Sequence, residues 1–510
     1  MVVNTVANWA GTAVATIASL ILTPYLLEQL EATRFGLYQI NRQFIMYLVL
    51  LDLGIIGSVM RFASQAIAAR DRNRINALTN SALLLYLVIA TAGVLVSVVV
   101  AGVAPAFFKV ETRYVAETRW LFWGLGIWWA ITMLAYPAKG ILMGHQRYDL
   151  LSLITASGWL LTVALVFGLF EFGHVNLGAL SLAFITGAVF QLGAAVLLAG
   201  WLQPGLRWTL RMVDRASLGT LYRFGAWNML FTIAGLFLWS TDNILIGRFL
   251  GPEMVALYAI PFMLINYGRT VVAGFSTPLT PLAAAYGTQN RAGLQTMLVR
   301  GTRVALILAL AINGMLVVLA EDLLRLWIGP AYAGSWIIYA FLMVSFWAFY
   351  AQRPIYNILM GTGDIRGPAA AVLAATLMTL LAKILALDWL GLGVEAFALL
   401  NCLFILPVML IYMPWHGARL VGMPLWQLYR RAYAGPLLIF PMVAGAGWLL
   451  RSYIVPDSLI EWIVLYAVLV LAYLLAALPT LDAADRATAL APLRRPWNRR
   501  EVKTPAAGNP

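Results

Sequence analysis

The chain has 510 residues, of which 62% are hydrophobic and only 11% are charged. A soluble domain carries about 25% charged residues, so the composition excludes an ordinary soluble protein and indicates an all-α polytopic membrane protein. The single cysteine, Cys402, excludes an intrachain disulfide and a C-x-x-C site.

Fourteen apolar segments are long enough to cross a bilayer as helices. They lie near residues 3–27, 36–60, 77–105, 120–138, 150–170, 176–201, 224–247, 254–284, 304–320, 332–352, 367–387, 396–415, 432–450 and 462–480. The last residues, 481–510, are rich in Pro and Arg, which is typical of a disordered tail.

The positions of Lys and Arg predict the orientation, because cytoplasmic loops are enriched in both residues. Of the 34 Lys and Arg, 24 follow even-numbered segments, 7 follow odd-numbered segments and 3 lie inside segments. This bias predicts that both termini face the cytoplasm. It also accounts for the net charge of +13 without an acidic partner, so we expect no nucleic acid to bind.

The first segment carries a polar stripe at helical spacing, which recurs 220 residues later. The matching pairs include Asn8 with Asn228, Thr12 with Thr232, and Thr23 with Asn243. A polar face toward lipid is costly, so each stripe is expected to face a neighbouring helix or a cavity. Hydrogen bonding between helices explains one stripe equally well, but the recurrence favours two related halves around a shared cavity.

A second match supports this repeat. Residues 137–144 read PAKGILMG and residues 354–361 read PIYNILMG, at an offset of 217. The two matches predict two parallel six-helix repeats, related by an axis along the membrane normal, plus two C-terminal helices. We assign 1–201 to the N-terminal bundle, 202–223 to a cytoplasmic linker, 224–415 to the C-terminal bundle, 416–480 to helices 13 and 14, and 481–510 to a basic cytoplasmic tail.

Five charged residues lie inside predicted helices: Arg42, Asp52, Asp242, Arg269 and Lys383. Each costs about 2.5–3.5 kcal/mol at a helix centre, so each is expected to face a partner or water. Ion pairs are one interpretation, such as Arg42 or Arg269 with Asp52 or Asp242. Three cations cannot all pair with two anions, which leaves at least one to bind a phosphate in a water-filled cavity.

Lys139 and Arg353 lie at the inner ends of the fourth and tenth segments. They are candidates to guide an anionic headgroup from the cytoplasm. The alternative, that they only mark the positive-inside boundary, is the interpretation we favour.

The absent motifs argue against an enzyme. The sequence has no P-loop, no G-x-S-x-G and no His/carboxylate cluster. The three histidines, His145, His174 and His416, lie far apart in predicted loops, so no metal site is expected. We therefore predict no catalytic residues and no cofactor, apart from an H⁺ or Na⁺ coupling ion.

The stretch from Leu22 to Arg61 contains Pro24 late in the first helix, the turn Phe35-Gly36-Leu37-Tyr38, and Leu51-Asp52-Leu53-Gly54. It resembles the opening of the Wzx-type bacterial polysaccharide flippases of the multidrug/oligosaccharidyl-lipid/polysaccharide exporter superfamily. The fourteen segments in the pattern of six, six and two also resemble that family.

This resemblance implies a transporter that flips polyprenyl-diphosphate-linked oligosaccharide repeat units across the inner membrane by alternating access, for surface polysaccharides such as lipopolysaccharide or exopolysaccharide. Carried over to this sequence, it implies Arg42 and Arg269, then Lys383, as cavity cations, and Asp52 and Asp242 as residues for ion pairing or for a coupling ion. Expected partners are the lipid-linked substrate, membrane lipids, and polysaccharide polymerase and ligase machinery.

Two other functions stay open. An exporter of cationic small molecules, driven by an H⁺ or Na⁺ gradient, would use Asp52 and Asp242 as its site. Cation exporters of the superfamily commonly carry an acidic residue in the first helix, and lipid II flippases typically carry arginines there. Residues 1–27 contain no charge, so both relatives fit less well. The third function is a membrane scaffold that holds polysaccharide-assembly enzymes through its basic tail.

Overall fold

The computed structural model describes residues 2–52, 55–215, 217–218, 235–237, 239–287, 289–364 and 366–482. Within these ranges the side chains of residues 2–15, 56, 57, 61, 210, 281, 388 and 389 lie outside the description. Every regular element in the described part of the chain is helical. The predicted all-α fold is therefore confirmed.

The first long helix, α1 (Val2–Leu48), combines the first predicted segment with most of the second. Glu31 separates the two parts, because its backbone has non-helical angles of φ 62° and ψ 166°. The 3₁₀-helix η1 (Val49–Asp52) and then α2 (Ile55–Ala68) follow. Asp52 is therefore the last residue of a 3₁₀-helix inside the second predicted segment.

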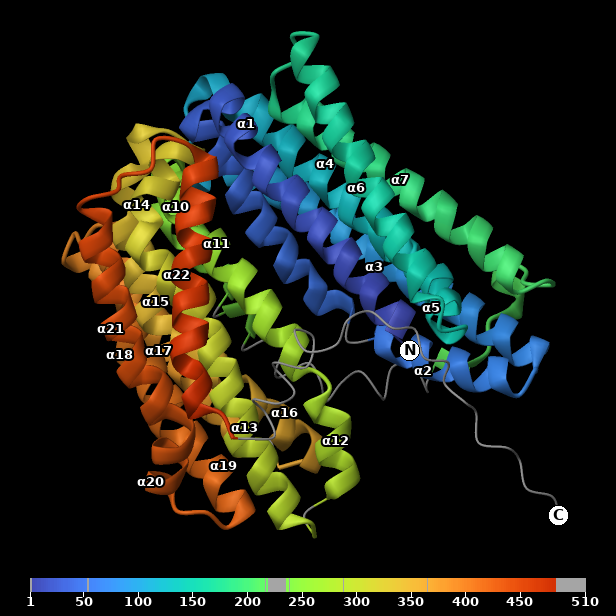
Figure 1. The fold of residues 1–510 in the computed structure, drawn as a ribbon. Helices are drawn as coiled ribbons and strands as arrows, with labels where there is room; N and C mark the ends of the chain where they lie inside the picture. Colours follow the sequence, from blue (N-terminus) through green and yellow to red (C-terminus); the bar gives the residue numbers. More distant parts are fainter. Residues whose placement is uncertain are drawn as a thin grey trace, which may run out of the picture. The chain divides into compact units, whose positions relative to one another are not determined.

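The rest of the first half is a series of long helices joined by short turns. These are α3 (Arg72–Phe107), α4 (Val115–Leu134), α5 (Tyr136–Gly144), α6 (Tyr148–Glu171) and α7 (Leu177–Leu202), with 3₁₀ turns η2 (Thr112–Tyr114) and η3 (Leu210–Met212). In Figure 1, α4, α6 and α7 run side by side. Pro137 begins α5 in the first turn, where its missing N–H leaves no bond unmade.

The second half follows the same order. Its helices are α10 (Asp242–Phe249), α11 (Pro252–Ser276), α12 (Leu279–Tyr286), α13 (Arg291–Ala309), α14 (Met315–Trp327), α15 (Trp336–Ala351), α16 (Arg353–Thr362), α17 (Arg366–Trp389), α18 (Val394–Pro407) and α19 (Met413–Val421). The π-helices η5 (Leu310–Gly314) and η7 (Val408–Tyr412) connect α13 to α14 and α18 to α19, and the 3₁₀-helix η6 (Pro330–Ser335) precedes α15. Pro354 lies in the first turn of α16, as Pro137 lies in the first turn of α5.

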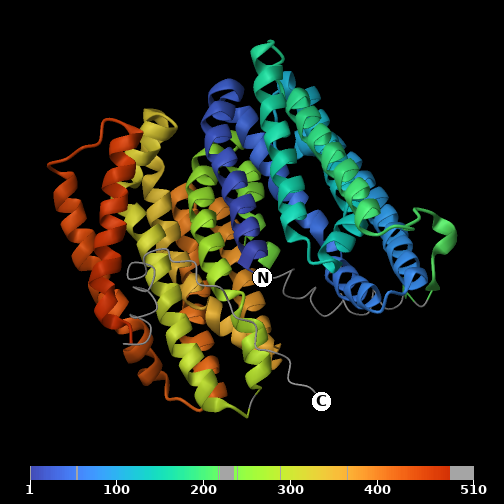
Figure 2. The same ribbon diagram turned by 45° about the vertical axis from the view of Figure 1, so that its right-hand side comes forward.

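Two further long helices close the described chain. Short α20 (Leu425–Leu428) and the π-helix η8 (Tyr429–Tyr433) lead into α21 (Ala434–Arg451), which packs alongside α22 (Leu459–Ala477), as Figure 2 shows. The 3₁₀-helix η9 (Leu478–Thr480) ends it. The indole of Trp462 donates to the Leu319 carbonyl at 3.0 Å, and the Tyr466 hydroxyl donates to the Ile312 carbonyl at 2.7 Å. These bonds fix α22 to the backbone of η5 and α14.

Eleven helices of the described chain are long and apolar enough to cross a membrane. The predicted count of fourteen stays a prediction, because the segment 224–247 lies largely outside the described residues.

The helices gather into two compact units. The larger contains Met1–Thr270, Ala320–Phe346 and Asp364–Met413, and the smaller contains Val271–Leu319, Trp347–Gly363 and Pro414–Pro510. Of the predicted site residues, Arg353 belongs to the smaller unit and the others belong to the larger. The bundle boundaries predicted from the sequence remain predictions.

The backbone itself carries the internal repeat. Twelve described residues have a positive φ, which residues other than Gly rarely adopt. They fall into six pairs separated by 217 to 220 positions: Glu31/Gly251, Arg70/Gly287, Lys109/Gly329, Gln146/Gly363, Gly173/Gly391 and Gly205/Gly422. The two halves therefore turn at equivalent places, which supports the predicted repeat.

The repeated glycine at the end of α5 and of α16 makes an equivalent contact in each half. A side chain at Gly144 would meet Ile67 and the backbone nitrogen of Ser64 in α2. A side chain at Gly361 would meet α12 at the Thr280 carbonyl, Ala283 and the backbone nitrogen of Ala284. Both glycines thus allow a short helix to pack closely on its partner.

Candidate functional site

The described end of the first polar stripe contacts α11. The Tyr267 hydroxyl donates a hydrogen bond to Ser19 Oγ at 3.0 Å. Thr23 Oγ1 donates to the Ser19 carbonyl at 2.7 Å and lies 3.7 Å from Met263 Sδ. This part of the stripe therefore faces a helix of the second half.

Four other stripe residues are predicted to line the cavity. The side chains of Asn8 and Thr12 and the whole of Asn228 and Thr232 lie outside the described residues. Their role in lining a cavity stays a prediction.

Two of the predicted cavity cations lie on aromatic rings. Arg42 is exposed, and its guanidinium carbon lies 5.8 Å from the ring centre of Tyr38, one turn earlier in α1. It also interacts electrostatically with Tyr267. Arg269 holds its guanidinium carbon 4.3 Å from the ring centre of Trp239. Residues two apart on a helix do not face each other, so Arg269 and Tyr267 leave α11 on different sides.

The Trp239 ring beside Arg269 packs against two other aromatic rings. Trp239 stacks on Phe346 with ring centres 4.6 Å apart, and Phe262 lies 5.9 Å from it. Arg269 thus lies against a cluster of three aromatic rings.

The third predicted cation, Lys383, is buried in an ion pair. Its Nζ lies 2.6 Å from Asp242 Oδ1 and donates to Asn401 Oδ1 at 2.8 Å. The Tyr258 hydroxyl donates to the other oxygen of Asp242, and the Lys383 Nζ lies 4.6 Å from the ring centre of Phe397. The side chains of Lys383 and Asp242 are 3% and 6% exposed. Asp242 thus pairs with Lys383, and the contact of Lys383 with a diphosphate stays a prediction.

A second buried polar cluster lies in the first half. Asp52 Oδ1 accepts a hydrogen bond from the Tyr86 hydroxyl at 2.7 Å, and the Tyr86 ring centre lies 5.5 Å from that of Tyr136. The Nζ of Lys139 lies 5.8 Å from the Tyr136 ring centre and donates to Gln191 Oε1 at 3.4 Å. Lys139 is only 7% exposed, so it lies inside the helix packing and not in a solvated loop.

Arg353 begins α16 and is half-buried. Its guanidinium carbon lies 5.1 Å from the ring centre of Tyr356, and its Nε is buried without a hydrogen-bond partner among the described residues. Its role in receiving a headgroup stays a prediction.

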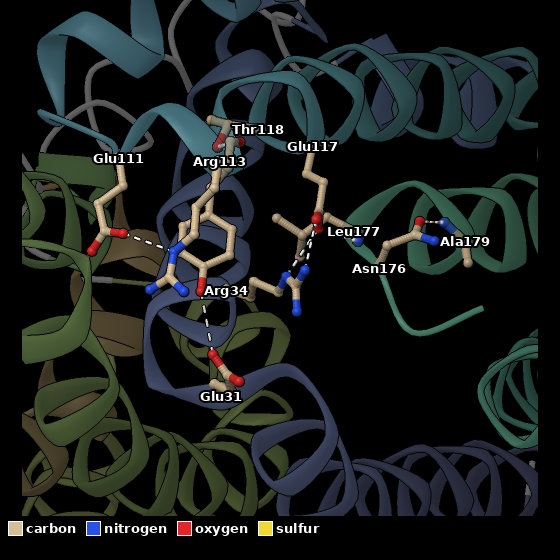
Figure 3. Close-up of polar contacts among 10 residues, drawn as sticks. Glu31, Arg34, Glu111, Arg113, Glu117, Thr118, Asn176, Leu177 and Ala179 are labelled. Carbon is tan, nitrogen blue, oxygen red and sulfur yellow. Dashed lines mark hydrogen bonds and ion pairs between the residues drawn. The ribbon is translucent and has the colours of Figure 1, made fainter. Parts of the chain in front are cut away.

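A cluster that the sequence did not predict joins the turn of α1 to the starts of α4 and α7. Figure 3 shows Arg34 pointing at Glu117. The Arg34 guanidinium donates to both Glu117 oxygens, at 2.7 Å and 3.0 Å, and Glu117 Oε2 also accepts from the Leu177 backbone N–H at 3.3 Å. One carboxylate therefore holds α1 and also caps the first turn of α7.

The same cluster encloses a tyrosine between two guanidinium groups. Arg34 and Arg113 lie 5.0 Å and 4.5 Å from the ring centre of Tyr114, whose hydroxyl donates to Glu31 Oε2 at 3.2 Å. Arg113 also pairs with Glu111 at 2.7 Å (Figure 3). The charges come from turns far apart in the chain, so no periodic pattern connects them. The available signal was an acid at a helix start, which the helix dipole favours.

No group of three or more His, Cys, Asp or Glu that could hold a metal ion occurs among the residues whose placement is described. The candidate site described above consists of arginines, aromatic rings and buried polar pairs.

The family of the chain follows from comparison with known proteins. Residues 1–286 match the family described as polysaccharide biosynthesis protein. The chain belongs to this family. Residues 229–385 also match the MatE family. The resemblance carried by Leu22–Arg61 is thus confirmed at the level of the exporter superfamily, and the chain is a multi-pass membrane protein.

Similar proteins and structures agree with this family. The uncharacterized membrane protein EpsK of Bacillus subtilis (strain 168) is 24% identical over 452 residues, which cover 85% of this chain and 86% of that protein. The lipid II flippase MurJ in an inward closed conformation superposes with a TM-score of 0.67 at 11% identity, over 97% of this chain and 100% of that chain. An inward-facing multidrug resistance MATE family transporter superposes with a TM-score of 0.66 at 17% identity, over 81% and 95%. At these identities the two structures establish the fold alone.

Proposed function

We propose that the protein flips polyprenyl-diphosphate-linked oligosaccharide repeat units across the bacterial inner membrane, for the synthesis of a surface polysaccharide. The family match over residues 1–286 carries this proposal. A solved structure with the same fold is a flippase of lipid II, which supports a lipid-linked substrate. The protein moves its substrate without a covalent step, so we assign it no catalytic residue.

Arg42 and Arg269 are the proposed contacts of the diphosphate. Both present a guanidinium against an aromatic ring, and a guanidinium binds phosphate oxygens through two parallel N–H donors. Contact with the ring of Trp239 restricts the Arg269 side chain, which reduces the side-chain entropy lost when the ligand binds. Lys139 and Arg353 are proposed to attract the headgroup, and Lys383 to support the site from within its ion pair.

The proposed function also implies where the substrate is loaded, where it is released and which ion drives transport. With both termini in the cytoplasm, the substrate is loaded there and released to polymerase and ligase machinery on the other side. The driving ion is H⁺ or Na⁺, and Asp52 and Asp242 are the acids proposed to couple to it.

An exporter of cationic small molecules is the second candidate, and the MatE match over residues 229–385 favours it. Such an exporter needs an acid that a cationic drug can reach. Asp242 is buried against Lys383, and Asp52 is buried and accepts a hydrogen bond from Tyr86. Of the five predicted intramembrane charges, all of which the structure describes, Arg42 is exposed and Arg269 is half-buried, so cations and not acids are accessible and the flippase is the better-supported function.

The first test replaces Arg269 with Ala in cells that depend on the protein for surface polysaccharide. We expect export to be lost while the protein still accumulates in the membrane. Arg248→Ala is the matched control, because Arg248 also stacks on a ring, with its guanidinium carbon 5.3 Å from the Phe107 ring centre, but at the end of α10. Full export by a well-expressed Arg269→Ala protein would remove this residue from the mechanism.

A binding measurement separates the two candidates. A ligand that binds only the folded state raises its stability by about 2.7 kcal/mol at a hundred times its dissociation constant. We expect a polyprenyl-diphosphate oligosaccharide to stabilise the purified protein, and this effect to be lost in Arg269→Ala. Stabilisation by tetraphenylphosphonium alone would favour the exporter of cations.

A further inference from the structure

The chain just after α22 is joined to α13 by one aspartate. Asp482 Oδ2 lies 3.4 Å from Nε of Arg300, and Asp482 Oδ1 accepts a hydrogen bond from Nη1 of Arg303 at 3.3 Å. Nε of Arg303 donates to the Arg431 carbonyl at 2.9 Å. All four residues belong to the smaller unit. One carboxylate is therefore shared by two arginines that lie one helical turn apart.

These residues lie at the level where a bilayer places its phosphates. Arg303, Arg431 and Asp482 are each within two residues of the end of a predicted span, and all three ends face the cytoplasm in the predicted orientation. Headgroups lie just outside the hydrocarbon core, and anionic lipids of the cytoplasmic leaflet attract Lys and Arg. Trp426 is 61% exposed and has the Arg430 guanidinium carbon 5.3 Å from its ring centre, which is typical of this interface.

The two sides of the contact differ in exposure. The side chain of Arg303 is 7% exposed, whereas that of Asp482 is 49% exposed. A buried guanidinium without a counter-charge destabilises a protein strongly, so Arg303 requires an anion. Partial burial raises the pKa of Asp482, but Arg303 and Arg300 outweigh this effect and hold that pKa below its ordinary value. Asp482 therefore supplies the anion in this structure, from a position where another anion can compete with it.

The contacts of Asp482 are longer than those of a firm ion pair in the same protein. A charge-assisted hydrogen bond is typically about 2.7–2.9 Å long. Arg34 donates to both oxygens of Glu117 at 2.7 Å and 3.0 Å, whereas Asp482 gives each of its arginines one contact of 3.3 Å or 3.4 Å. A tetrahedral phosphate presents its oxygens in several directions, so it can bind two guanidinium groups at once. The two arginines on α13 thus suit a phosphate better than this carboxylate.

We propose that Arg300 and Arg303 form a binding site for the phosphate of an anionic phospholipid in the cytoplasmic leaflet, and that Asp482 is a built-in competitor for this site. When the headgroup binds, Asp482 is displaced and the end of α22 is released from α13. The lipid composition of the membrane thereby controls how firmly the last helix is attached. The proposal goes beyond the proposed function, because this lipid belongs to the surrounding membrane and is not transported. It rests on the orientation predicted from the loop charges.

Thermal unfolding of the purified full-length protein tests the site. Phosphatidylglycerol is compared with phosphatidylcholine of the same acyl chains and with inorganic phosphate. We expect only phosphatidylglycerol to raise the melting temperature, and Arg300→Gln to abolish this rise. Arg325→Gln is the matched control, because Arg325 is 37% exposed, against 41% for Arg300, and contacts Asp322 at 3.6 Å, but lies at the opposite end of the same span.

Removal of the competitor tests the role of Asp482. We expect Asp482→Asn to lower the phosphatidylglycerol concentration for a half-maximal effect by about two- to fivefold, which is the contribution of a half-exposed ion pair expressed as a ratio of affinities. Asp457→Asn makes the same change of charge at an exposed position before the other end of α22. This control should leave the concentration unchanged.

Labelling tests whether the headgroup displaces Asp482. Leu481→Cys, in a Cys402→Ala background that contains no other cysteine, reports on the neighbouring residue. We expect phosphatidylglycerol to raise the rate of maleimide labelling and phosphatidylcholine to leave it unchanged. Arg300→Gln should remove this difference between the two lipids.

The possible outcomes are distinct. Equal stabilisation by the two lipids, or the same response in Arg300→Gln as in the parent protein, overturns the lipid site. Equal stabilisation by inorganic phosphate overturns phospholipid as the occupant, since it shows a general anion site. An unchanged concentration in Asp482→Asn, or labelling of Leu481→Cys that does not rise, means that Asp482 is not a competitor. None of these outcomes bears on the transported substrate, which the Arg269→Ala test decides separately.

Discussion

In the second half of the chain a lysine, an aspartate, a tyrosine and an asparagine meet in the buried interior, whereas the equivalent positions of the first half are almost entirely apolar. With offsets of 220 for Asp242 and Tyr258 and 217 for Lys383 and Asn401, the equivalent residues are Leu22, Tyr38, Val166 and Phe184. All four are buried, and the Tyr38 and Phe184 ring centres lie 6.0 Å apart. The repeat has thus kept its turns and replaced the chemistry between them.

The first half has its own polar cluster, but at other positions and with a looser arrangement. Asp52 accepts from Tyr86, as Asp242 accepts from Tyr258. Lys139 donates to Gln191 at 3.4 Å, as Lys383 donates to Asn401 at 2.8 Å. Lys383 also contacts the carboxylate of Asp242 directly, whereas Lys139 lies next to the ring of Tyr136. The two halves therefore share their turns but differ in their buried charges, and the variants below test what the charges do.

Breaking the ion pair between Lys383 and Asp242 is expected to have the largest effect on stability. In Lys383→Met the carboxylate of Asp242 stays buried without its cation, which typically destabilises a protein by about 3–5 kcal/mol. Adding Asp242→Leu reproduces the apolar character of Leu22 and Val166 in the first half, and we expect it to restore most of the stability. Thermal unfolding of the purified variants and their amounts in the membrane measure both effects.

The double variant also separates structure from transport. A stable double variant that no longer exports would show that the pair acts in the mechanism. A single variant as stable as the parent would contradict the view that the pair supports the interior of the second half.

The two repeated glycines sharpen the comparison, with a smaller effect. In Gly361→Ala the new methyl group meets backbone atoms of Thr280 and Ala284, which cannot move aside easily, so we expect a loss of about 1–3 kcal/mol. In Gly144→Ala the nearest atom is the flexible end of Ile67, so the loss should be smaller. Thermal unfolding of both variants gives the comparison, and an equal loss would mean that the two helix contacts are equally tight.

The left-handed turns provide the smallest test. Gly329 and Lys109 occupy equivalent turns at φ 114° and φ 51°. Gly329→Ala places a side chain where L-residues are strained and should cost about 1 kcal/mol or somewhat more. Lys109→Gly relieves only the milder strain of φ 51°, offset by the greater freedom of Gly in the unfolded chain, so we expect little change or a slight gain. Apparent melting temperatures of the two variants should shift in opposite directions or, for Lys109→Gly, not at all.

Much of the fold could be predicted from the sequence, because hydrophobic length and repeated motifs are local signals. The match between 137–144 and 354–361 marks two short helices, α5 and α16, that begin at equivalent prolines. The turn between the first two segments was predicted, but its position at Glu31 was not, because neither Gly nor Pro occurs there and the conformation is held by distant contacts such as that with Tyr114.

The site could be predicted only in part. Arg42, Asp52, Asp242, Arg269 and Lys383 stand out because charge is rare in a membrane helix. Which charges meet depends on how each helix is rotated about its axis, and the sequence does not specify this rotation. The sequence therefore indicated Asp242 as a residue to be paired, but the structure was needed to identify Lys383 as its partner.

The ion pair of the second half also has a consequence for synthesis of the chain. Asp242 emerges 141 residues before Lys383, and at about 5–20 residues per second the ribosome needs about 7–30 s to supply the partner. A lone carboxylate at the centre of a membrane helix costs about 2.5–3.5 kcal/mol during that interval. We expect the helix that carries Asp242 to stay beside the insertion machinery until the helix that carries Lys383 arrives. The equivalent helix of the first half carries the apolar Leu22 at this position, so it can enter the membrane without a partner.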